Sequence, residues 1–573
     1  MTVQSITTDI LILGAGGAGL FAALHAKKAN PDLDVTIAVK GLLGKCGCTR
    51  MVQGGYNVAL SPEDSVERHF MDTIEGGGWL NDQDLAWLLV ETAPKRIREL
   101  ETDLGCFFDR NPDGTVHQKA FAGQTFDRTV HKGDLTGIEI INRLAEQVWR
   151  RDVKRLEDFR ALDLIPSADG SQLAGVLMLD MRNGQPLLVR ARATLLATGG
   201  GPTMYRYHTP SGDKSCDGLA MALRARLPLR DIEMVQFHPT GLLAGEGTRM
   251  TGTVLEEGLR GSGGYLTDAQ GKRFMFDYDP RGERATRDIV SRSIQDRIRK
   301  GHASPHGGVY IEMGHLGPER VRREFKGMVE RCEDCGFDLA GGRVEVIPTA
   351  HYMMGGVTFK ADCTTEMPGL YAAGEDTGGV HGANRLGGNG VANSTVFGGI
   401  AGDIMGERTR RDGALPEPDA GVMEAARARA FSPLGRKTGN LPEMRERLYS
   451  IMWDDVGILR DAQSLARGRA ALDTLASDIA ACGVGDDNLR YNLTWMDRLN
   501  LENLTLVSRA ICAAAEFRRD SRGAHFREDF PDVSDLAASA FTSVLLSGSE
   551  LNVTSSPVAF TRVRPGQSLL AKA

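Results

Sequence analysis

Thr8-Asp9-Ile10-Leu11-Ile12-Leu13-Gly14-Ala15-Gly16-Gly17-Ala18-Gly19 is the stretch that decides the fold of this chain. The apolar run from Ile10 to Leu13 predicts a short buried strand, and the Ala-rich residues 20–29 predict a helix. The glycines between them form G-x-G-x-x-G. The first allows a tight turn, the second lets the backbone approach a pyrophosphate, and the third lets the helix pack on the strand. The helix N-terminus favours negative charge. This strand–turn–helix context predicts that the chain binds a dinucleotide.

Composition and charge narrow the class of protein. A chain of 573 residues is long enough for several domains, and 41% hydrophobic with 25% charged residues is ordinary for a soluble globular protein. A net charge of −7 argues against a general nucleic-acid binder. The nine scattered cysteines indicate a reducing compartment. No run approaches the roughly 18 apolar residues of a membrane helix. We therefore expect a cytoplasmic protein, or one peripheral to the membrane through a partner.

Residues 34–39 predict the second strand, and the residue that closes it is unusual. An NAD-binding fold commonly places Asp or Glu there to bond the ribose hydroxyls. This chain has Lys40 instead. The substitution argues against a simple NAD site and fits another dinucleotide geometry.

Two later strands also end in glycine, at 193–201 and at 370–375. They predict that the chain returns to the same cofactor far along the sequence. We therefore expect an α/β protein with a Rossmann-like domain split into residues 1–241 and 346–415. Residues 242–345 would be an inserted capping domain that forms the substrate cleft. Residues 416–520 are helical and charged, which predicts a helical domain, and 521–573 are an irregular C-terminal domain.

Several polar residues stand out as candidates for chemistry. His238 lies in what the sequence predicts to be a Gly/Thr-rich loop at 236–241, and Glu257 and Arg260 are three residues apart. Arg287 is expected in the first turn of a helix. Spacing alone leaves open that Arg287 and Asp288 are simply the solvent-exposed charges of a helix start. The pair Cys332 and Cys335 lacks a second pair at zinc spacing, so we interpret it as structural or incidental.

Once the motifs between His351 and Asn389 are included, the chain resembles the flavoprotein subunit of succinate dehydrogenase and fumarate reductase. The resemblance covers nearly the whole length. It rests on the glycine fingerprint together with further ordered motifs: Ala197-Thr198-Gly199-Gly200, Gln236-Phe237-His238-Pro239-Thr240-Gly241, Arg287-Asp288, His351-Tyr352-Met353-Met354-Gly355-Gly356, His381-Gly382-Ala383-Asn384-Arg385-Leu386-Gly387-Gly388-Asn389 and Ser521-Arg522-Gly523-Ala524-His525. The resemblance implies a bound FAD and interconversion of a saturated dicarboxylate and its alkene, with hydride exchange at flavin N5.

The resemblance also implies roles for residues. Arg287 would be the proton donor to the alkene carbon, or the acceptor in the reverse direction, and Glu257 and Arg260 would relay protons to it. The pKa of an arginine stays above about 12, so such a group can work only if its proton is replaced as fast as it leaves. His238, His351 and Arg385 would bind the substrate carboxylates, since Arg offers a planar fork, and Phe121 would pack on the substrate.

The cofactor contacts that follow from the fingerprint and the resemblance come from distant parts of the chain. They are Gly14, Gly16, Ala18, Gly19, Lys40, Cys48, Thr49, Gln53, Gly54, Gly55, Thr198, Gly199, Asp217, Gly374, Glu375, Arg385, Asn389 and Ser394. No metal site is expected.

This chain departs from the family pattern at three places. Where membrane-complex members carry a His that binds the flavin covalently, it has Cys48, which predicts noncovalent FAD. Glu256 stands where the family usually has Thr before the relay Glu. A carboxylate there would repel a dianion by several kcal/mol at contact, at an effective dielectric constant of about 20. Unless Glu256 turns away, the substrate could carry an amino, hydroxyl or bulkier group. Third, residues 389–394 differ in sequence from the family pattern, in a segment that the resemblance places beside the flavin.

Other functions remain open at this stage. L-Aspartate oxidase shares the fold and motifs but usually lacks the forms seen at 351–356 and 385–388. A non-catalytic flavin-binding or electron-transfer subunit would not need Arg287, His238, His351 and Arg385 together. The sequence holds no iron–sulfur ligand set, so electrons would come from another agent. An iron–sulfur subunit or other electron-transfer partner is one possibility.

Overall fold

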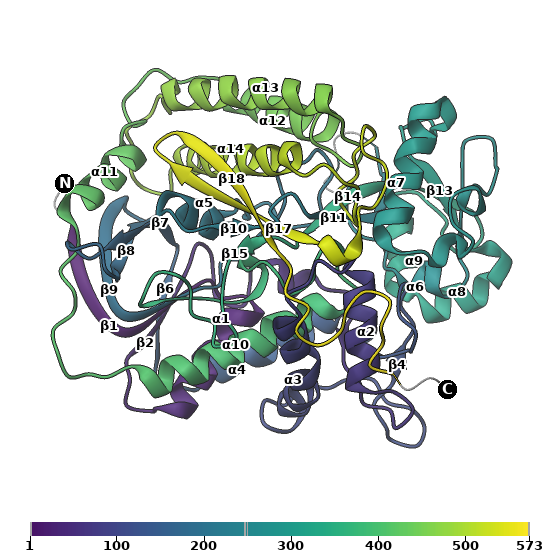
Figure 1. Cartoon of the computed structure of the whole chain (residues 1–573), viewed down its shortest axis with the longest axis horizontal. Helices are drawn as coiled ribbons and strands as arrows, with labels where there is room; N and C mark the ends of the chain where they lie inside the picture. Colours follow the sequence, from purple (N-terminus) through teal and green to yellow (C-terminus); the bar gives the residue numbers. More distant parts are fainter. Residues whose placement is uncertain (1–2, 246–247, 249, 571–573) are drawn as a thin grey trace.

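The fold centres on a mostly parallel sheet that begins with the opening stretch (Figure 1). The computed structural model describes residues 3–245, 248 and 250–570. The strand order is β6-β2-β1-β9-β8-β7, with β16 also paired to β9. The strands are β1 (Gln4–Leu13), β2 (Val35–Val39), β6 (Val153–Glu157), β7 (Phe159–Pro166), β8 (Leu173–Asp180), β9 (Gln185–Leu196) and β16 (Leu370–Ala372). Because β1 pairs with β2 and β9 in parallel register, and β16 joins from residue 370, the split Rossmann-like arrangement is confirmed.

Glycines bring the backbone into close contact around β1. After β1 the chain turns into α1 (Gly17–Ala29). Gly14 has φ of 107°, and a Cβ there would lie 2.1 Å from the carbonyl oxygen of Ala197. A Cβ on Gly19 would lie 2.0 Å from the oxygen of Gly14, which agrees with its predicted role in helix–strand packing.

Helix α10 (Asn389–Arg408) lies against α1 and is rich in small residues. Cβ atoms on Gly398 and Gly402 would lie 2.5 and 2.4 Å from the oxygens of Ala18 and Ala22. The small residues therefore allow the two helices to approach, and both N-termini reach the same end of the sheet.

Residues 56–149 add helices and a small sheet beside this core. Residues 66–102 hold two helices, because the chain turns between Gly77 and Asp82, whose side chain caps the second. The elements are α2 (Val66–Gly76), α3 (Gln83–Thr102), α4 (Thr136–Trp149) and a sheet of order β3-β5-β4 made by β3 (Tyr56–Asn57), β5 (Thr129–Val130) and β4 (Gln118–Lys119).

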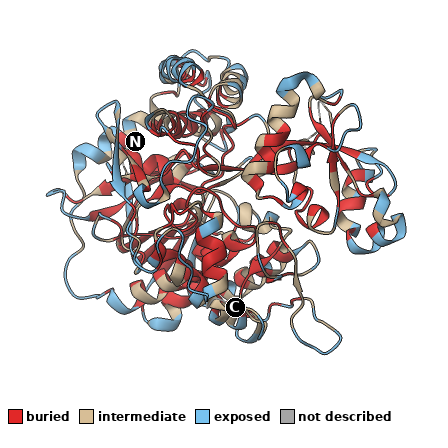
Figure 2. Cartoon of the chain, turned by 45° about the vertical axis from the view of Figure 1, so that its right-hand side comes forward, coloured by how far each residue is buried: buried red, intermediate tan, exposed pale blue. Residues whose placement is uncertain are grey.

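The inserted segment forms a lobe with its own buried core, visible at the right in Figure 2. Its sheet has the order β11-β14-β13-β12. The elements are β11 (Val235–Leu242), β12 (Tyr265–Thr267), β13 (Val309–Glu312), β14 (Arg343–Met353), α6 (Gly258–Gly261), α7 (Arg287–Arg297), α8 (Pro318–Glu324) and α9 (Lys326–Glu333). The loop predicted at 236–241 is wrong: these residues form β11, which is buried throughout and paired with β14.

The C-terminal part wraps back onto the core. The predicted helical region holds α11 (Ala420–Phe431), α12 (Leu441–Asp454), α13 (Ala462–Ala481) and α14 (Leu493–Phe517). The last 50 residues are not wholly irregular. Strands β17 (Ala540–Ser547) and β18 (Glu550–Pro557) form a hairpin that pairs with β10 (Leu229–Arg230), which in turn pairs with β15 (Gly356–Val357). The short helix α5 (Asp217–Arg224) precedes β10.

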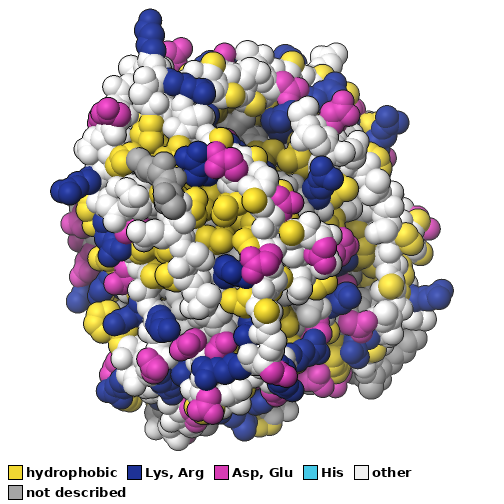
Figure 3. All heavy atoms as spheres, turned by 90° about the vertical axis from the view of Figure 1, so that its left-hand side faces the viewer, with side chains coloured by type: hydrophobic (Ala, Val, Ile, Leu, Met, Phe, Trp, Pro, Cys, Tyr) yellow, Lys and Arg dark blue, Asp and Glu magenta, His cyan; other side chains and the backbone are white. Residues whose placement is uncertain are grey.

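On the face shown in Figure 3, Lys and Arg side chains are interspersed with Asp and Glu. Among the described residues, no helix has the length and apolarity needed to cross a bilayer.

Candidate active site

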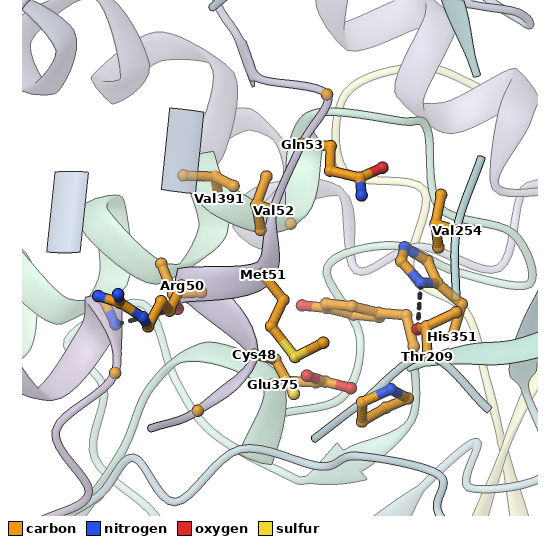
Figure 4. A pocket seen from close by; sticks show the side chains of 18 of the residues that line it. Cys48, Arg50, Met51, Val52, Gln53, Thr209, Val254, His351, Glu375 and Val391 are labelled. Atoms are coloured by element: carbon orange, nitrogen blue, oxygen red, sulfur yellow. Dashed lines mark hydrogen bonds between the residues drawn. The ribbon is translucent and has the colours of Figure 1, made fainter. Parts of the chain in front are cut away.

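A cavity of about 610 Å³ lies where the N-termini of α1 and α10 meet the inserted lobe. Ligand pockets are typically about 300–1,000 Å³. Its wall includes most of the predicted site residues: Gly16, Ala18, Cys48, Thr49, Gln53, Gly54, Gly55, Phe121, Thr198, Gly199, His238, Glu256, Glu257, Arg287, His351, Gly374, Glu375, Arg385 and Ser394. Figure 4 shows part of this wall, with Gln53 beside Val254 and Cys48 beside Glu375. The fold thus brings residues from every third of the chain to one space.

A smaller hollow of about 60 Å³ continues this space toward the end of β2. Gly14, Lys40 and Asp217 line it, and Gly16, Thr198 and Gly199 line both spaces. Lys40 Nζ donates to Asp217 Oδ2 at 2.8 Å. Burial lowers the pKa of Lys40, although the Asp217 carboxylate opposes this change. The residue that closes β2 is therefore part of the elongated site, as its departure from Asp or Glu suggested.

Two helix ends make this space suitable for an anionic dinucleotide. Neither α1 nor α10, both described in full, has a side-chain cap or an acidic residue in its first turn. Their N-terminal residues line the cavity, so the positive ends of two helix dipoles lie at it, and the Gly17 N–H donates to Thr49 Oγ1 at 3.1 Å. Lys214 adds a cation to the walls of both spaces. The donors and the elongated shape fit the pyrophosphate and the extended length of FAD.

Arg287 and Glu257 form the charged centre of the wall on the lobe side. Arg287 Nε donates to Glu257 Oε2 at 3.0 Å, and Arg287 Nη2 donates to the same oxygen. Arg260 Nη2 donates to Glu257 Oε1 at 3.1 Å. Burial opposes ionisation of Glu257, but Arg287 and Arg260 hold its pKa below the ordinary value. A carboxylate therefore stands between two guanidinium groups, and Arg260 lies behind it, outside the cavity wall.

Gln236 couples Arg287 to Arg385, another arginine that lines the cavity. Its Oε1 accepts from Arg287 Nη1 at 3.1 Å and from Arg385 Nη2 at 3.0 Å. Arg385 also stacks on Tyr352, with the guanidinium carbon 4.5 Å from the ring centroid. Burial and the nearby Arg287 lower the pKa of Arg385 to about 10, so it remains a cation at neutral pH. The guanidinium groups of Arg287 and Arg385 are thus held at a fixed spacing. Each can bind a carboxylate through two hydrogen bonds.

The two predicted histidines face one another across the cavity wall. The ring centroids of His238 and His351 are 5.4 Å apart. His351 Nδ1 hydrogen bonds with Thr209 Oγ1 at 2.7 Å (Figure 4). Burial, followed by the positive charge of Arg287, lowers the pKa of both histidines well below the ordinary value. Each is therefore a neutral imidazole at pH 7, able to donate or accept one hydrogen bond.

Glu256 lines the cavity, and its carboxylate is paired with a cation. Its Oε2 accepts from Lys119 Nζ at 3.2 Å. Burial raises the pKa of Glu256, and Lys119 opposes this rise. The carboxylate is turned toward a cation on β4, so the sequence departure at this position does not by itself demand a modified substrate.

Glu375 and Cys48 mark the opposite side of the cavity. Glu375 Oε1 accepts from the backbone N–H groups of Met353 and Gly201 at 3.0 and 3.2 Å. Burial nevertheless raises the pKa of Glu375 to about 7. Burial, followed by the Glu375 carboxylate, raises the pKa of the Cys48 thiol to about 12. Cys48 is therefore a neutral thiol at pH 7.

Two predicted cofactor residues lie elsewhere. Gly19 is buried in the α1–β1 contact, and Asn389 lies outside the linings of both spaces. The Asn389 side chain hydrogen bonds with Asn57, His69 and Thr73 at 2.9, 3.0 and 3.1 Å. These bonds anchor the first turn of α10 to β3 and α2, which positions the helix end.

The geometry brings to the site several residues for which the sequence indicated no role. Gln236 lies in a motif that was quoted for its His, and Asp376 follows Glu375. Asp376 Oδ2 accepts from the N–H of Gly199 at 3.1 Å. Thr209 and Lys214 belong to no motif, so no sequence signal indicated them. The suspected pair Cys332 and Cys335 are free thiols in and just after α9.

Comparisons with known proteins agree with this geometry. The family described as "FAD binding domain" matches residues 9–391, and "Fumarate reductase flavoprotein C-term" matches residues 445–569. One component of the fumarate reductase (CoM/CoB) of Methanothermobacter marburgensis is 39% identical, over 91% of this chain and 94% of that protein. The fumarate reductase flavoprotein subunit of Escherichia coli is 33% identical, over 92% and 89%.

Solved structures extend the likeness to three dimensions. A variant of E. coli quinol fumarate reductase superposes with a TM-score of 0.92 at 31% identity, covering 99% of both chains. The chain is an FAD-dependent oxidoreductase. More narrowly, it belongs to the family of fumarate reductase and succinate dehydrogenase flavoprotein subunits.

Proposed function

We propose that this chain interconverts a dicarboxylate and its alkene, of the succinate and fumarate type, and works chiefly as a reductase. The observation that carries the proposal is the buried row Arg287–Glu257–Arg260, whose first member lines the cavity beside a second guanidinium. A dicarboxylate needs two clusters of donors, and Arg385 with the two histidines supplies them. The relatives named above do not favour aspartate oxidation as the alternative.

Each side chain has a distinct role in the proposed reaction. Arg385, His238 and His351 bind the substrate carboxylates, and Phe121 packs against its carbon chain. FAD, when held by the residues of the dinucleotide end, would supply the hydride that one alkene carbon accepts. Arg287 donates a proton to the other carbon, so that one hydride and one proton convert the alkene to the saturated acid. Glu257 then returns a proton to Arg287, and Arg260 supplies Glu257 from behind.

The flavin is proposed to be held without a covalent bond. Nucleophilic attack by sulfur requires the thiolate, and the half-buried thiol of Cys48 beside Glu375 is almost entirely protonated at neutral pH. A covalent link raises the flavin potential in the family that this chain resembles. Its absence would favour reduction of the alkene. Acid precipitation of the purified protein should release all flavin to the supernatant, and flavin that stays on the polypeptide would contradict the assignment.

The test of the reaction is turnover of an Arg287 variant. Arg287→Ala should lower the rate at which fumarate oxidises reduced viologen by about 10³-fold, since general acid catalysis contributes 10²–10⁴. Its flavin content should not change. Arg281→Ala is the matched control, because Arg281 is exposed and pairs with Asp279. Unchanged turnover in Arg287→Ala, or wild-type protein inactive with fumarate and related alkenedioates, would overturn the proposal.

Electrons are proposed to reach the flavin from a partner subunit or another donor. The relatives named above are subunits of larger enzymes. Among the described residues, no group of three or more His, Cys, Asp or Glu side chains could hold a metal ion.

A further inference from the structure

Lys119 and Glu256 join two separate parts of the chain at the cavity wall. Lys119 ends β4 of the small sheet, and Glu256 precedes α6 in the inserted lobe, which lies beside β4 in Figure 1. Their side chains are 18% and 6% exposed, and Nζ lies 3.2 Å from Oε2. Such a pair is largely shielded from water, so its charges interact more strongly than a surface pair does.

Both members adjoin groups that the proposed function assigns to the substrate. Phe121 follows Lys119 by two residues, and Lys119 Nζ is 5.8 Å from the centre of its ring. Glu257 is the next residue after Glu256. Phe121, Glu256 and Glu257 all line the cavity. Glu256 therefore stands in the same wall as the proton relay and the apolar contact for the substrate, and Lys119, outside the lining, contacts it.

Other charged groups face Glu256 at a greater distance. Asp134, beside α4, adds a like charge, and Arg331, on α9, adds an opposite one. Arg331 is already engaged: Nη1 donates to the oxygen of Val254 at 2.8 Å. The side-chain amide nitrogen of Gln53 donates to the oxygen of Val254 at 3.2 Å. Its side-chain oxygen accepts from Arg331 Nη2 at 2.9 Å. Among the residues that the structure describes, Lys119 is therefore the cation paired with Glu256.

We propose that Lys119 is a positioning residue that masks the Glu256 carboxylate and so lets the cavity bind a dianionic substrate. The proposal rests on the proposed function, since it assumes that the substrate carries two carboxylates. Without Lys119, an uncompensated carboxylate would stand beside Glu257 in the wall and repel the dianion. With Lys119 in place, the Glu256 carboxylate is paired, and Arg287 and Arg385 of the wall can attract the dianion. The pair also ties the lobe to β4 across the substrate space.

A double-mutant cycle tests the masking role in FAD-loaded protein. Lys119→Met should raise KM for fumarate at least about tenfold and change kcat much less, because a buried partner charge is left uncompensated. Adding Glu256→Gln should remove most of that increase. Lys119→Arg keeps the cation and should keep the wild-type KM. Equal increases in KM from Lys119→Met with and without Glu256→Gln, or no increase at all, would overturn the proposal.

The pH profile separates masking from a merely structural effect. In Lys119→Met, KM should fall as the pH is lowered and Glu256 becomes protonated. In the double variant, KM should lose this pH dependence. A pH-independent KM in Lys119→Met would contradict masking. If Lys119→Met does not fold, Lys119→Gln provides the same loss of charge with a polar side chain.

A control separates this proposal from the proposed function. Lys132→Met removes a lysine just beyond β5 that pairs with Asp109 at 3.1 Å, and it should leave KM unchanged. If wild-type protein does not reduce fumarate, the proposed function fails. If wild type is active and the Lys119 and Glu256 effects simply add, the masking role alone fails.

Discussion

Two of the glutamates that line the cavity, Glu257 and Glu375, are held in opposite ways. Glu257, on the lobe side, lies between Arg287 and Arg260, which keep its pKa below the ordinary value despite burial. Glu375, on the dinucleotide side, accepts from backbone N–H groups, and burial raises its pKa to about 7. Burial alone favours the neutral acid, and a paired guanidinium reverses this preference. One end of the site therefore depends on side-chain charge, and the other on backbone geometry.

The largest effect should come from removing the charge of Glu257. Glu257→Gln should lower kcat for fumarate reduction by about 10²–10⁴-fold, because an amide cannot return a proton to Arg287. FAD content should be unchanged, since this end does not hold the dinucleotide. Glu324→Gln, an exposed substitution on α8, is the control. If Glu257→Gln kept its turnover, the lobe side of the cavity would not depend on side-chain charge, and its contrast with the dinucleotide side would fail.

Glu375 should make the FAD-free protein less stable as the pH rises. Its pKa in the fold is about 7 against an ordinary value of 4.5. Its contribution is fully present below pH 4.5 and is lost as the pH rises through 7, on the order of 3 kcal/mol. Urea midpoints of wild type and Glu375→Gln should diverge over this range. Parallel pH profiles would contradict the assignment.

Gly14 tests the dependence of the dinucleotide end on backbone. Gly14→Ala should cost about 1–3 kcal/mol in stability and most of the bound FAD, because the added Cβ would meet the Ala197 oxygen. Gly170 also has positive φ, but open space surrounds it. Gly170→Ala should therefore lower Tm only slightly and keep full flavin content. If both variants lost equal amounts of flavin, the positive φ that they share would be the cause, and not the contact with the Ala197 oxygen.

Cys48 should give the smallest effect. Cys48→Ser replaces a neutral thiol with a hydroxyl of similar size. We expect flavin content to be unchanged and kcat to stay within about twofold of wild type, since a thiol at this pKa takes no part in covalent chemistry. Absorbance spectra and turnover provide the measurement. Loss of flavin in this variant would mean that the dinucleotide end also depends on a side chain.

The sequence was sufficient for what local pattern controls. The fingerprint at 14–19 and the glycine-ended strand at 370–372 correctly predicted a split sheet, because parallel strands with short apolar runs leave clear periodic signals. The loop predicted at 236–241 was wrong, because Pro239 and Gly241 suggest a turn while pairing with β14 decides the conformation. The hairpin β17–β18 escaped notice because its exposed residues hide the alternation expected of a strand.

The site was less predictable than the fold. Motifs pointed to Arg287 and Arg385, but not to Gln236, which accepts from both. Nor did they indicate that Lys119 compensates Glu256. Such contacts join residues that lie far apart in the sequence, and no local spacing encodes them. Roles carried by the resemblance remain predictions until the variants above are measured.

The late position of β16 in the chain has a consequence for synthesis. The cofactor cradle needs Gly374, Glu375 and the N-terminus of α10, which leave the ribosome long after β1 and α1. The inserted lobe, with its own core, can fold while the first half waits. The nascent chain would thus carry a half-built sheet edge for more than 150 residues of elongation, from the end of β9 at 196 to β16 at 370. A chaperone or rapid lobe folding would protect this edge from aggregation.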